Sequence, residues 1–232
     1  GIWGLAFSPD EHWLATGSDD FTTRLWDMTA VDPASNSIKL QGPSAWIETL
    51  AFSPDEHWLA TGSGDSTVQL WDLQTADPAV TSIKLLGHSD RVNTLAFSAD
   101  GHWLATGSAD ATARLWDLNS TDPNTSFKEL RGNSGEILAV AFSPDGRWLV
   151  TGSADNTARL WDLNSTNPNS SFKELLGHRD DVFAVAFSPD GHWLATGSGD
   201  KTARLWDLRS ADPATNSIQL RHDDQVKSLA FS

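Results

Sequence analysis

Four residue types that could perform chemistry recur together in this chain. They are His88, Ser108, Asp110 and Trp116 in one stretch, and His178, Ser198, Asp200 and Trp206 in another. Ser, His and Asp are the residues of a hydrolase triad, in which His activates the Ser nucleophile and Asp orients His. Such a triad also needs an oxyanion pocket and a nucleophile that faces a cleft. A set that returns in several copies is better explained as part of a scaffold, so a hydrolase is a remote alternative.

The elements that carry these residues repeat at a fixed interval. The five Trp-Asp pairs follow one another every 45 residues, at Trp26-Asp27, Trp71-Asp72, Trp116-Asp117, Trp161-Asp162 and Trp206-Asp207. Each interval contains short alternating runs and turn sequences. A period of this length with four strand-like runs is typical of a β-propeller repeat.

The third repeat shows the expected strands most clearly. Alternation of apolar and polar residues predicts strands at about 92–98, 103–108, 112–117 and 127–130. No segment has a sustained helical period, and both faces of each small sheet carry apolar residues. We therefore predict an all-β propeller of four-stranded antiparallel blades that bury one another by stacking.

The predicted domain is the whole chain, 1–232, divided into five full repeats and one extra strand. The repeats span approximately 1–45, 46–90, 91–135, 136–180 and 181–224, and the extra strand spans 225–232. A spare strand with open edges could pair with another copy, so self-association through the C-terminal strand is one expectation. His222 could then complete the polar set of the first repeat, whose Asp20 lacks a His. A fragment of a longer array and a closed five-bladed ring are the other interpretations.

The repeated motifs resemble those of WD-repeat β-propellers over almost the whole chain. The clearest copies are LLGHSD…LAFSADGHWLATGSADATARLWDL at 85–118 and LLGHRD…VAFSPDGHWLATGSGDKTARLWDL at 175–208. Their near identity is similar to bacterial WD-repeat arrays. The resemblance implies that each His, Ser, Asp and Trp set is a structural chain of hydrogen bonds, from Asp to His, His to Ser and Ser to the indole. Where His is missing beside Asp65 and Asp155, we expect either a less stable blade or the use of Ser44 and Asn133 as substitutes.

Composition narrows the classes of partner. The formal net charge is −15, which disfavours nucleic acid, and no apolar run approaches the roughly 20 residues that a membrane helix needs. Three sets of five Asp residues account for 15 of the 31 acidic residues, at repeated turn and Trp-Asp positions, so turn chemistry explains much of this charge. With no cysteine, neither disulfides nor Cys-based metal sites can form. We expect no metal and no cofactor, and a cytoplasmic protein.

The positions that differ between near-identical repeats predict a partner-binding surface. They cluster at the start of the first strand of each repeat, at Trp3, Trp46, Glu48, Arg91, Asn93, Glu136, Leu138, Asp181 and Phe183. Aromatic and apolar anchors with a charged rim are typical of a protein–protein hot spot. In the resembling family these loops line the top face, which commonly docks proteins or peptides. Drift without function, or packing against adjacent blades, is the competing interpretation.

The leading functional hypothesis is a non-enzymatic scaffold or sensor propeller that binds a protein or peptide on its top face. The alternative is a self-assembling structural module, such as a building block of a larger ring, with no ligand of its own. The first two repeats carry Glu11 and Glu56 where the others have Gly in the first hairpin turn. If the backbone there is left-handed, each Glu costs on the order of 1 kcal/mol.

Overall fold

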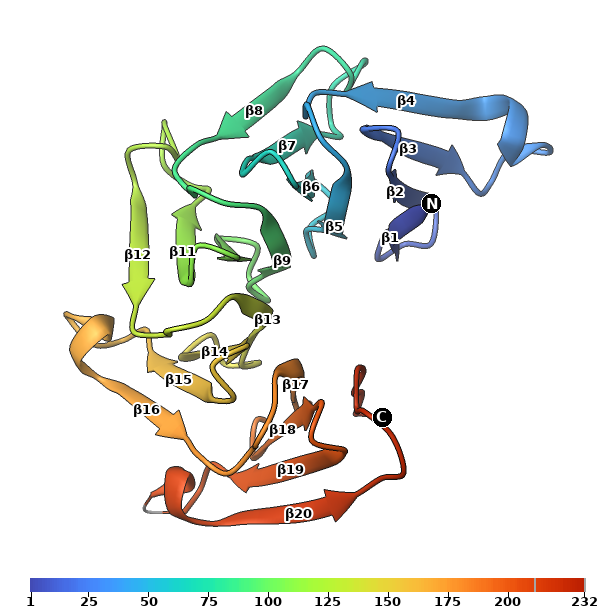
Figure 1. Cartoon of the computed structure of the whole chain (residues 1–232). Helices are drawn as coiled ribbons and strands as arrows, with labels where there is room; N and C mark the ends of the chain where they lie inside the picture. Colours follow the sequence, from blue (N-terminus) through green and yellow to red (C-terminus); the bar gives the residue numbers. More distant parts are fainter. Residues whose placement is uncertain (211, 232) are drawn as a thin grey trace. The chain divides into compact units, whose positions relative to one another are not determined.

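The computed structural model describes residues 1–210 and 212–231, and this part of the chain is all-β, as predicted. Its strands form five four-stranded sheets, which we call blades 1 to 5 (Figure 1). In every blade the sheet order follows the chain order, so each strand pairs with the next one in the sequence. Neighbouring strands are antiparallel, for example with Trp148 opposite Asp162 in blade 4.

The strand bounds repeat closely from blade to blade. Blade 1 consists of β1 (Ile2–Phe7), β2 (Trp13–Ser18), β3 (Thr22–Asp27) and β4 (Ser37–Gln41). Blade 2 consists of β5 (Ile47–Phe52), β6 (Trp58–Ser63), β7 (Val68–Asp72) and β8 (Ser82–Leu85). Blade 3 consists of β9 (Val92–Phe97), β10 (Trp103–Ser108), β11 (Thr112–Asp117) and β12 (Phe127–Arg131). Blade 4 consists of β13 (Ile137–Phe142), β14 (Trp148–Ser153), β15 (Ala158–Asp162) and β16 (Phe172–Leu175). Blade 5 consists of β17 (Val182–Phe187), β18 (Trp193–Ser198), β19 (Thr202–Asp207) and β20 (Ser217–Arg221).

Within residues 1–210 and 212–231, helical structure is limited to three short 3₁₀ segments between the third and fourth strands of a blade. They are η1 (Pro33–Asn36), η2 (Pro168–Ser170) and η3 (Pro213–Thr215). Each begins with a Pro, whose fixed φ and missing N–H suit the first position of a helix. Among the described residues no helix has the length and apolar content that a membrane crossing requires.

The repeated acidic turn between the first two strands of a blade is held by its own side chains. In blade 4 the Ser143 hydroxyl donates to Asp145 at 2.5 Å, and the N–H of Trp148 donates to the Ser143 hydroxyl at 2.8 Å. Gly146 has a φ of 68°, and Glu11 has a φ of 62° at the corresponding place in blade 1. The left-handed backbone expected at this position is therefore present, and glycine tolerates it better than glutamate does.

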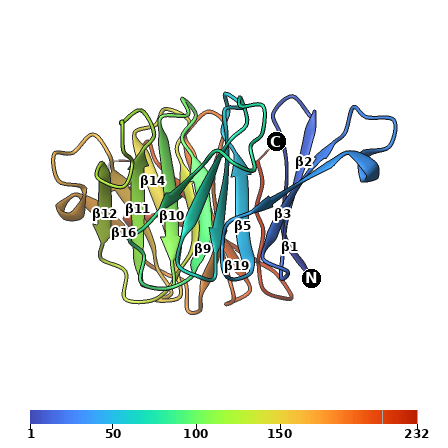
Figure 2. The ribbon, with the colours of Figure 1, turned by 90° about the horizontal axis from the view of Figure 1, so that it is seen from above.

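The chain divides into two compact halves. The first half is Gly1–Thr106 with Trp116–Phe127, and the second half is Gly107–Leu115 with the described chain from Lys128 onward. In the first half β5 lies against β1 and β2. Strand β9 lies beside β5 (Figure 2) and also contacts β6. In the second half β17 lies against β13 and β14. Stacked strands of this kind bury apolar side chains from two blades in one core.

The cores between blades contain Leu, Val and Trp side chains at equivalent positions. In the first half, Leu25 and Leu40 of blade 1 share a core with Leu50 and Trp71 of blade 2. In the second half, an equivalent core joins blades 4 and 5, and Trp206 within it is only 1% exposed. These contacts explain why a single four-stranded repeat would leave both apolar faces in water.

A glycine in the second strand of blades 1, 2, 4 and 5 lets the following segment of the chain approach closely. A Cβ added at Gly152 would lie 2.8 Å from the carbonyl oxygen of Val182. One added at Gly17 would lie 2.5 Å from the Ile47 side chain, and one added at Gly197 would lie 2.7 Å from Val226. Val226 therefore docks on blade 5 in the way that Val182 docks on blade 4.

The extra strand predicted at 225–232 is the one element that the structure does not form. Residues 222–231 belong to no strand, and position 232 lies outside the described residues. A strand needs a ladder of backbone hydrogen bonds with a neighbour. This segment has two such bonds to blade 5, from the N–H of His222 to the carbonyl of Lys201 at 2.9 Å and from the N–H of Val226 to the carbonyl of Ser198 at 3.0 Å. The segment is thus anchored by a buried valine without being part of a sheet.

Candidate functional site

The His, Asp and Trp side chains of blade 5 form a continuous hydrogen-bonded chain. His178 lies with Nδ1 3.1 Å from Asp200 Oδ2 and with Nε2 2.8 Å from the Thr196 hydroxyl. The indole Nε1 of Trp206 donates to the same Thr196 oxygen at 3.0 Å. Since Thr196 accepts from the indole, it can donate to Nε2, and the imidazole proton then lies on Nδ1 and points to Asp200. The chain satisfies polar groups in the core of the blade.

The prediction that Ser198 links His to Trp is wrong, because Thr196 occupies this place. Trp206 is paired across the sheet with Leu194, so Thr196 is its diagonal neighbour and Ser198 lies about 7 Å further along the strand. The Ser198 hydroxyl instead donates to the Asp180 carbonyl at 2.9 Å and accepts from the N–H of Asp200. These partners hold Ser198 to the turn and not to the imidazole, so Ser198 is not paired with a base as the serine of a triad would be.

Blade 3 repeats the threonine link. Among the residues of this blade that belong to the first compact half, His88 Nε2 lies 2.8 Å from the Thr106 hydroxyl, which accepts from Trp116 Nε1 at 3.0 Å. Among those that belong to the second compact half, the N–H of Asp110 donates to the Ser108 hydroxyl at 3.1 Å. The expected link from Ser108 to the Trp116 indole is therefore wrong in the same way as in blade 5. Thr stands two residues before Ser in both strands, and the strand register is the signal that would have identified it.

The blades that lack His use substitutes, as predicted. In blade 4 the Thr151 hydroxyl donates to Asn133 at 3.3 Å, and the Asn133 amide lies 3.5 Å from Asp155. In blade 2 the Ser44 hydroxyl and N–H both donate to Asp65, at 2.9 and 2.7 Å. The Asp at this position thus finds donors whichever residue replaces the imidazole.

The ionisation of these groups follows from their surroundings. Burial by itself raises the pKa of Asp200, but hydrogen bonds from Thr202, the N–H of Arg179 and His178 lower that pKa to about 2. Burial similarly opposes donors from Thr157 and Arg159 at Asp155, whose pKa is also about 2. Burial lowers the pKa of His178 below its usual 6.5, against the pull of Asp200. At neutral pH the chain therefore contains a neutral imidazole and an ionised carboxylate.

Three of the predicted partner-binding residues meet in the first half. Trp3, Trp46 and Glu48 line a cavity of about 340 Å³ together with Asp19. Trp3 is 64% exposed and Trp46 is 42% exposed, which is unusual for side chains of this size. Trp3 Nε1 donates to Asp19 Oδ1. Trp46 packs over Gly64, where an added Cβ would lie 2.6 Å from the indole.

The remaining predicted residues of the first half form a polar pair. Arg91 Nε donates to the Asn93 amide oxygen at 3.0 Å. Both side chains are partly exposed at the start of β9. They lie on the same short segment, so their contact holds the guanidinium in one orientation.

The predicted residues of the second half carry acidic and apolar groups. The pKa of Asp181 is raised, first by burial and then by the nearby charges of Asp180 and Glu136. Phe183 faces the ammonium of Lys227 at 5.9 Å, within the range of a cation–π contact. Leu138 is partly exposed. Two acidic side chains therefore share this surface with one aromatic ring.

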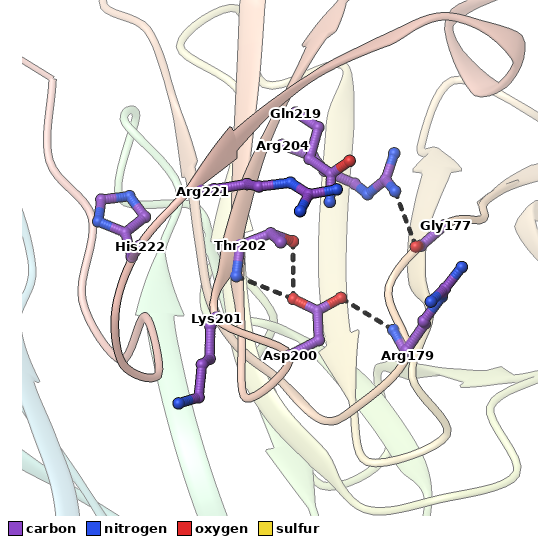
Figure 3. A pocket seen from close by; sticks show the side chains of 9 residues that line it. All are labelled: Gly177, Arg179, Asp200, Lys201, Thr202, Arg204, Gln219, Arg221 and His222. Atoms are coloured by element: carbon purple, nitrogen blue, oxygen red, sulfur yellow. Dashed lines mark hydrogen bonds between the residues drawn. The ribbon is translucent and has the colours of Figure 1, made fainter.

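A polar cavity in blade 5 was not anticipated from the sequence. It has a volume of about 360 Å³ and is lined by Gly177, Arg179, Asp200, Lys201, Thr202, Arg204, Gln219, Arg221 and His222 (Figure 3). Arg179 and Lys201 are basic where blade 4 has Ser134 and Asn156, and this difference was the available signal. Among the described residues no group of three or more His, Asp or Glu side chains is arranged to hold a metal ion.

Comparison with protein families agrees with the repeat structure. The family model described as "WD domain, G-beta repeat" matches five segments, at residues 1–27, 35–72, 80–117, 124–162 and 169–207. These segments end on the five Trp-Asp pairs and cover most of the chain. No curated protein sequence matches the chain. With five four-stranded sheets and five matching repeats, the chain belongs to the WD40 repeat family.

Proposed function

We propose that the protein is a non-enzymatic interaction module that binds a protein or peptide through the first strands of its blades. WD40 repeats are typically protein-interaction scaffolds. The observation that carries the proposal for this chain is the cavity lined by Trp3, Trp46 and Glu48. Two exposed indoles beside carboxylates offer a large apolar contact with a polar rim, which is the composition of an interaction hot spot.

The hydrogen-bonded chains in the blades support the non-enzymatic part of the proposal. The only hydroxyl that His178 and Trp206 share belongs to Thr196, which is fully buried and accepts from the indole. A nucleophile must reach its substrate and must be activated by a base. Thr196 is therefore placed to stabilise blade 5 and not to attack a substrate.

The test is a selection of peptides from a random peptide display library on the intact chain. We expect the protein to enrich peptides with a shared sequence, and the Trp46→Ala variant to lose their binding at least tenfold. Phe183→Ala tests the second half in the same way. Val80→Ala serves as the control, because it removes an apolar side chain that is 76% exposed, more than Trp46 at 42%, and that is remote from these strands in the sequence.

Two outcomes would contradict the proposal. Peptides that bind the Trp46→Ala and Phe183→Ala variants as tightly as the unchanged protein would show that another surface is used. Loss of the β-sheet circular dichroism signal in both variants would show that the two aromatics are core residues.

A specific observation favours a second candidate function, assembly with another copy of the chain. Ile2, Leu5 and Phe7 on β1 are 61%, 61% and 54% exposed, whereas Leu50 and Phe52 at the same positions of blade 2 are 8% and 9% exposed. On blade 5, Leu220 is 43% exposed, whereas Leu175 at the same position of blade 4 is buried. Between consecutive blades, a face equivalent to the exposed face of β1 packs against a face equivalent to the exposed face of blade 5, and both are buried.

We infer that the β1 face of one copy covers the blade 5 face of a second copy. Light scattering should then give a mass above that of one 25.2 kDa chain. Leu5→Asp should reduce the mass to one chain, whereas Val80→Asp should not. A single-chain mass for the unchanged protein at high concentration would refute this candidate.

A further inference from the structure

The cavity in blade 5 gathers positive charge on an acidic protein. The chain has a net charge of −15, yet Arg179, Lys201, Arg204 and Arg221 all line this one cavity. Asp200 is the only carboxylate among its lining residues. Arg204 and Arg221 lie on the same side of Asp200, while Arg179 approaches from the segment that precedes β17 (Figure 3). The cavity is therefore a local cationic site.

In blade 4 the charge of the equivalent arginine is neutralised by two carboxylates. Arg159, the counterpart of Arg204, donates to Asp155 at 2.8 Å and to Glu174 at 2.5 Å. Glu174 is the residue opposite Arg159 across the sheet, and in blade 5 the residue opposite Arg204 is Gln219. A neutral amide thus replaces the carboxylate, so Arg204 has no cross-strand counter-charge.

Three further differences from blade 4 add positive charge around Arg204. Arg179 replaces Ser134, Lys201 replaces Asn156, and Arg221 replaces Leu176, at equivalent positions of the repeat. A repeat that drifted at random would not be expected to gain three cations and lose one anion around one cavity. The concentration of changes points to a ligand of opposite charge.

The cationic side chains of the cavity can donate hydrogen bonds to such a ligand in addition to the bonds they make within the protein. Arg204 Nη1 and Nη2 donate to the Ser217 hydroxyl at 2.7 Å and to the Gly177 carbonyl at 2.8 Å, which fixes the guanidinium in place. Lys201 donates to the carbonyl of Asp223 at 3.0 Å. Asp200 already accepts from Thr202 and from the N–H of Arg179 and contacts His178, so it is committed to the blade. The exposed side chains of Arg179 and Arg221 complete the rim.

We propose that this cavity binds a phosphate group, with Arg204, Arg221 and Arg179 as the principal contacts and Lys201 at the edge. A guanidinium group can donate two parallel hydrogen bonds to two oxygens of a phosphate group. Several guanidinium groups together stabilise a doubly charged phosphate better than they stabilise a singly charged carboxylate. A volume of about 360 Å³ admits a phosphate group and a small attached residue. None of the lining residues of this cavity belongs to the proposed partner surface, and the proposal does not depend on that one.

Isothermal titration calorimetry tests the proposal on the full chain at constant ionic strength. Inorganic phosphate and O-phosphoserine are the two ligands, with acetate as a singly charged comparison. We expect saturable binding of at least one phosphate compound and at least tenfold weaker binding of acetate. Tighter binding of O-phosphoserine identifies a phosphate monoester as the ligand, and tighter binding of inorganic phosphate identifies the free anion.

Variants that copy blade 4 into blade 5 give the sharper comparison. Gln219→Glu supplies Arg204 with the counter-charge that Glu174 gives Arg159, and it should weaken phosphate binding about tenfold or more. Arg221→Leu should have a similar effect. Arg209→Leu removes the same charge from an exposed loop residue of blade 5 that does not line the cavity, and it should leave binding unchanged within about twofold.

The proposal is overturned if neither phosphate compound binds saturably, or if acetate binds as tightly as phosphate. It is also overturned if Arg209→Leu weakens binding as much as Arg221→Leu, because general charge and not the cavity would then attract the anion. Circular dichroism of each variant establishes that blade 5 is still folded, and Gln219→Glu is the informative variant should Arg221→Leu not fold.

Discussion

Blades 4 and 5 have the same strands in the same register but balance their charges differently. In blade 4, Arg159 is 6% exposed, lies between two carboxylates, and has its guanidinium 5.7 Å from the Phe172 ring. In blade 5, Ser217 replaces Phe172 and Gln219 replaces Glu174, so Arg204 donates to a hydroxyl and a carbonyl instead. One repeat thus uses its arginine to hold the blade together, and the next holds its arginine at the edge of a cavity.

The difference begins at the position of the imidazole. His178 contacts Asp200 in blade 5, whereas Asn133 in blade 4 makes only a long contact to Asp155, at 3.5 Å. The same oxygen, Asp155 Oδ2, accepts from Arg159 at 2.8 Å. The residue at this position stands between two cavity-lining residues in blade 5, Gly177 and Arg179, and it differs between the blades together with the partners of the arginine. The comparison teaches that the charge of a blade surface depends on its interior polar chain.

The largest effect is expected from removing the charge of the buried carboxylate in each blade. Asp155→Asn leaves the buried Arg159 with only the half-exposed Glu174, so the free energy of unfolding should fall by about 3 kcal/mol. Asp200→Asn leaves a neutral His178 and should cost about 1 kcal/mol. Urea unfolding followed by tryptophan fluorescence measures both values. Equal losses in the two variants would mean that Arg159 does not depend on Asp155.

An effect of intermediate size is expected on the pH dependence of stability, because blade 5 has a buried histidine where blade 4 has an asparagine. The pKa of His178 is lower in the folded protein than its usual 6.5, so the unfolded chain binds the proton more readily. Stability from this group is complete above about pH 6.5 and is lost as the pH falls below it. His178→Asn copies Asn133 of blade 4 and should remove this part of the loss between pH 7 and 5, as measured by urea unfolding at each pH.

The unchanged protein and the His178→Asn variant should both lose further stability at lower pH. Asp155 and Asp200 have pKa values of about 2 in the folded state against 3.8 in the unfolded state, so their contribution is present above about pH 4 and declines toward pH 2. If the His178→Asn variant lost stability between pH 7 and 5 as steeply as the unchanged protein, His178 would not be the titrating group.

The smallest effect is expected from exchanging the cross-strand partners of the arginines. Gln219→Glu should raise the free energy of unfolding by about 0.5 kcal/mol, since Glu174 in the equivalent pair is itself 38% exposed. Glu174→Gln should lower it by a similar amount. The same Gln219→Glu change in an Arg204→Gln background measures the pairwise part, and a gain that persisted there would have another cause.

Sequence periodicity was sufficient for the fold because its causes are local. Alternation along 92–97, 103–108 and 112–117 and the glycine or aspartate turns between them fix the strands of blade 3 to within a residue of the observed bounds. The extra strand at 225–232 failed for the opposite reason. Its residues repeat the pattern of β17, but a strand also needs a neighbour to pair with, and the pattern contains no information about that neighbour.

The polar chain shows where residue types ceased to be enough. Ser198 and Thr196 are both hydroxyl residues on one strand, and both point to the same face because they are two residues apart. Only the register of Trp206 against Leu194 decides that the indole reaches Thr196. Trp3 and Trp46 were predicted as members of one partner-binding surface, whereas their common cavity depends on the contact between β1 and β5.

By itself, the sequence determined the 45-residue repeat, the strands of the five blades and the family. The tertiary structure alone decided which hydroxyl joins His178 to Trp206, which carboxylate neutralises Arg159, and which cations surround Arg204. The physical reason is range: turn and strand preferences act between neighbours in the chain, whereas hydrogen bonds and charge balance act over a few ångströms between segments that only folding brings together.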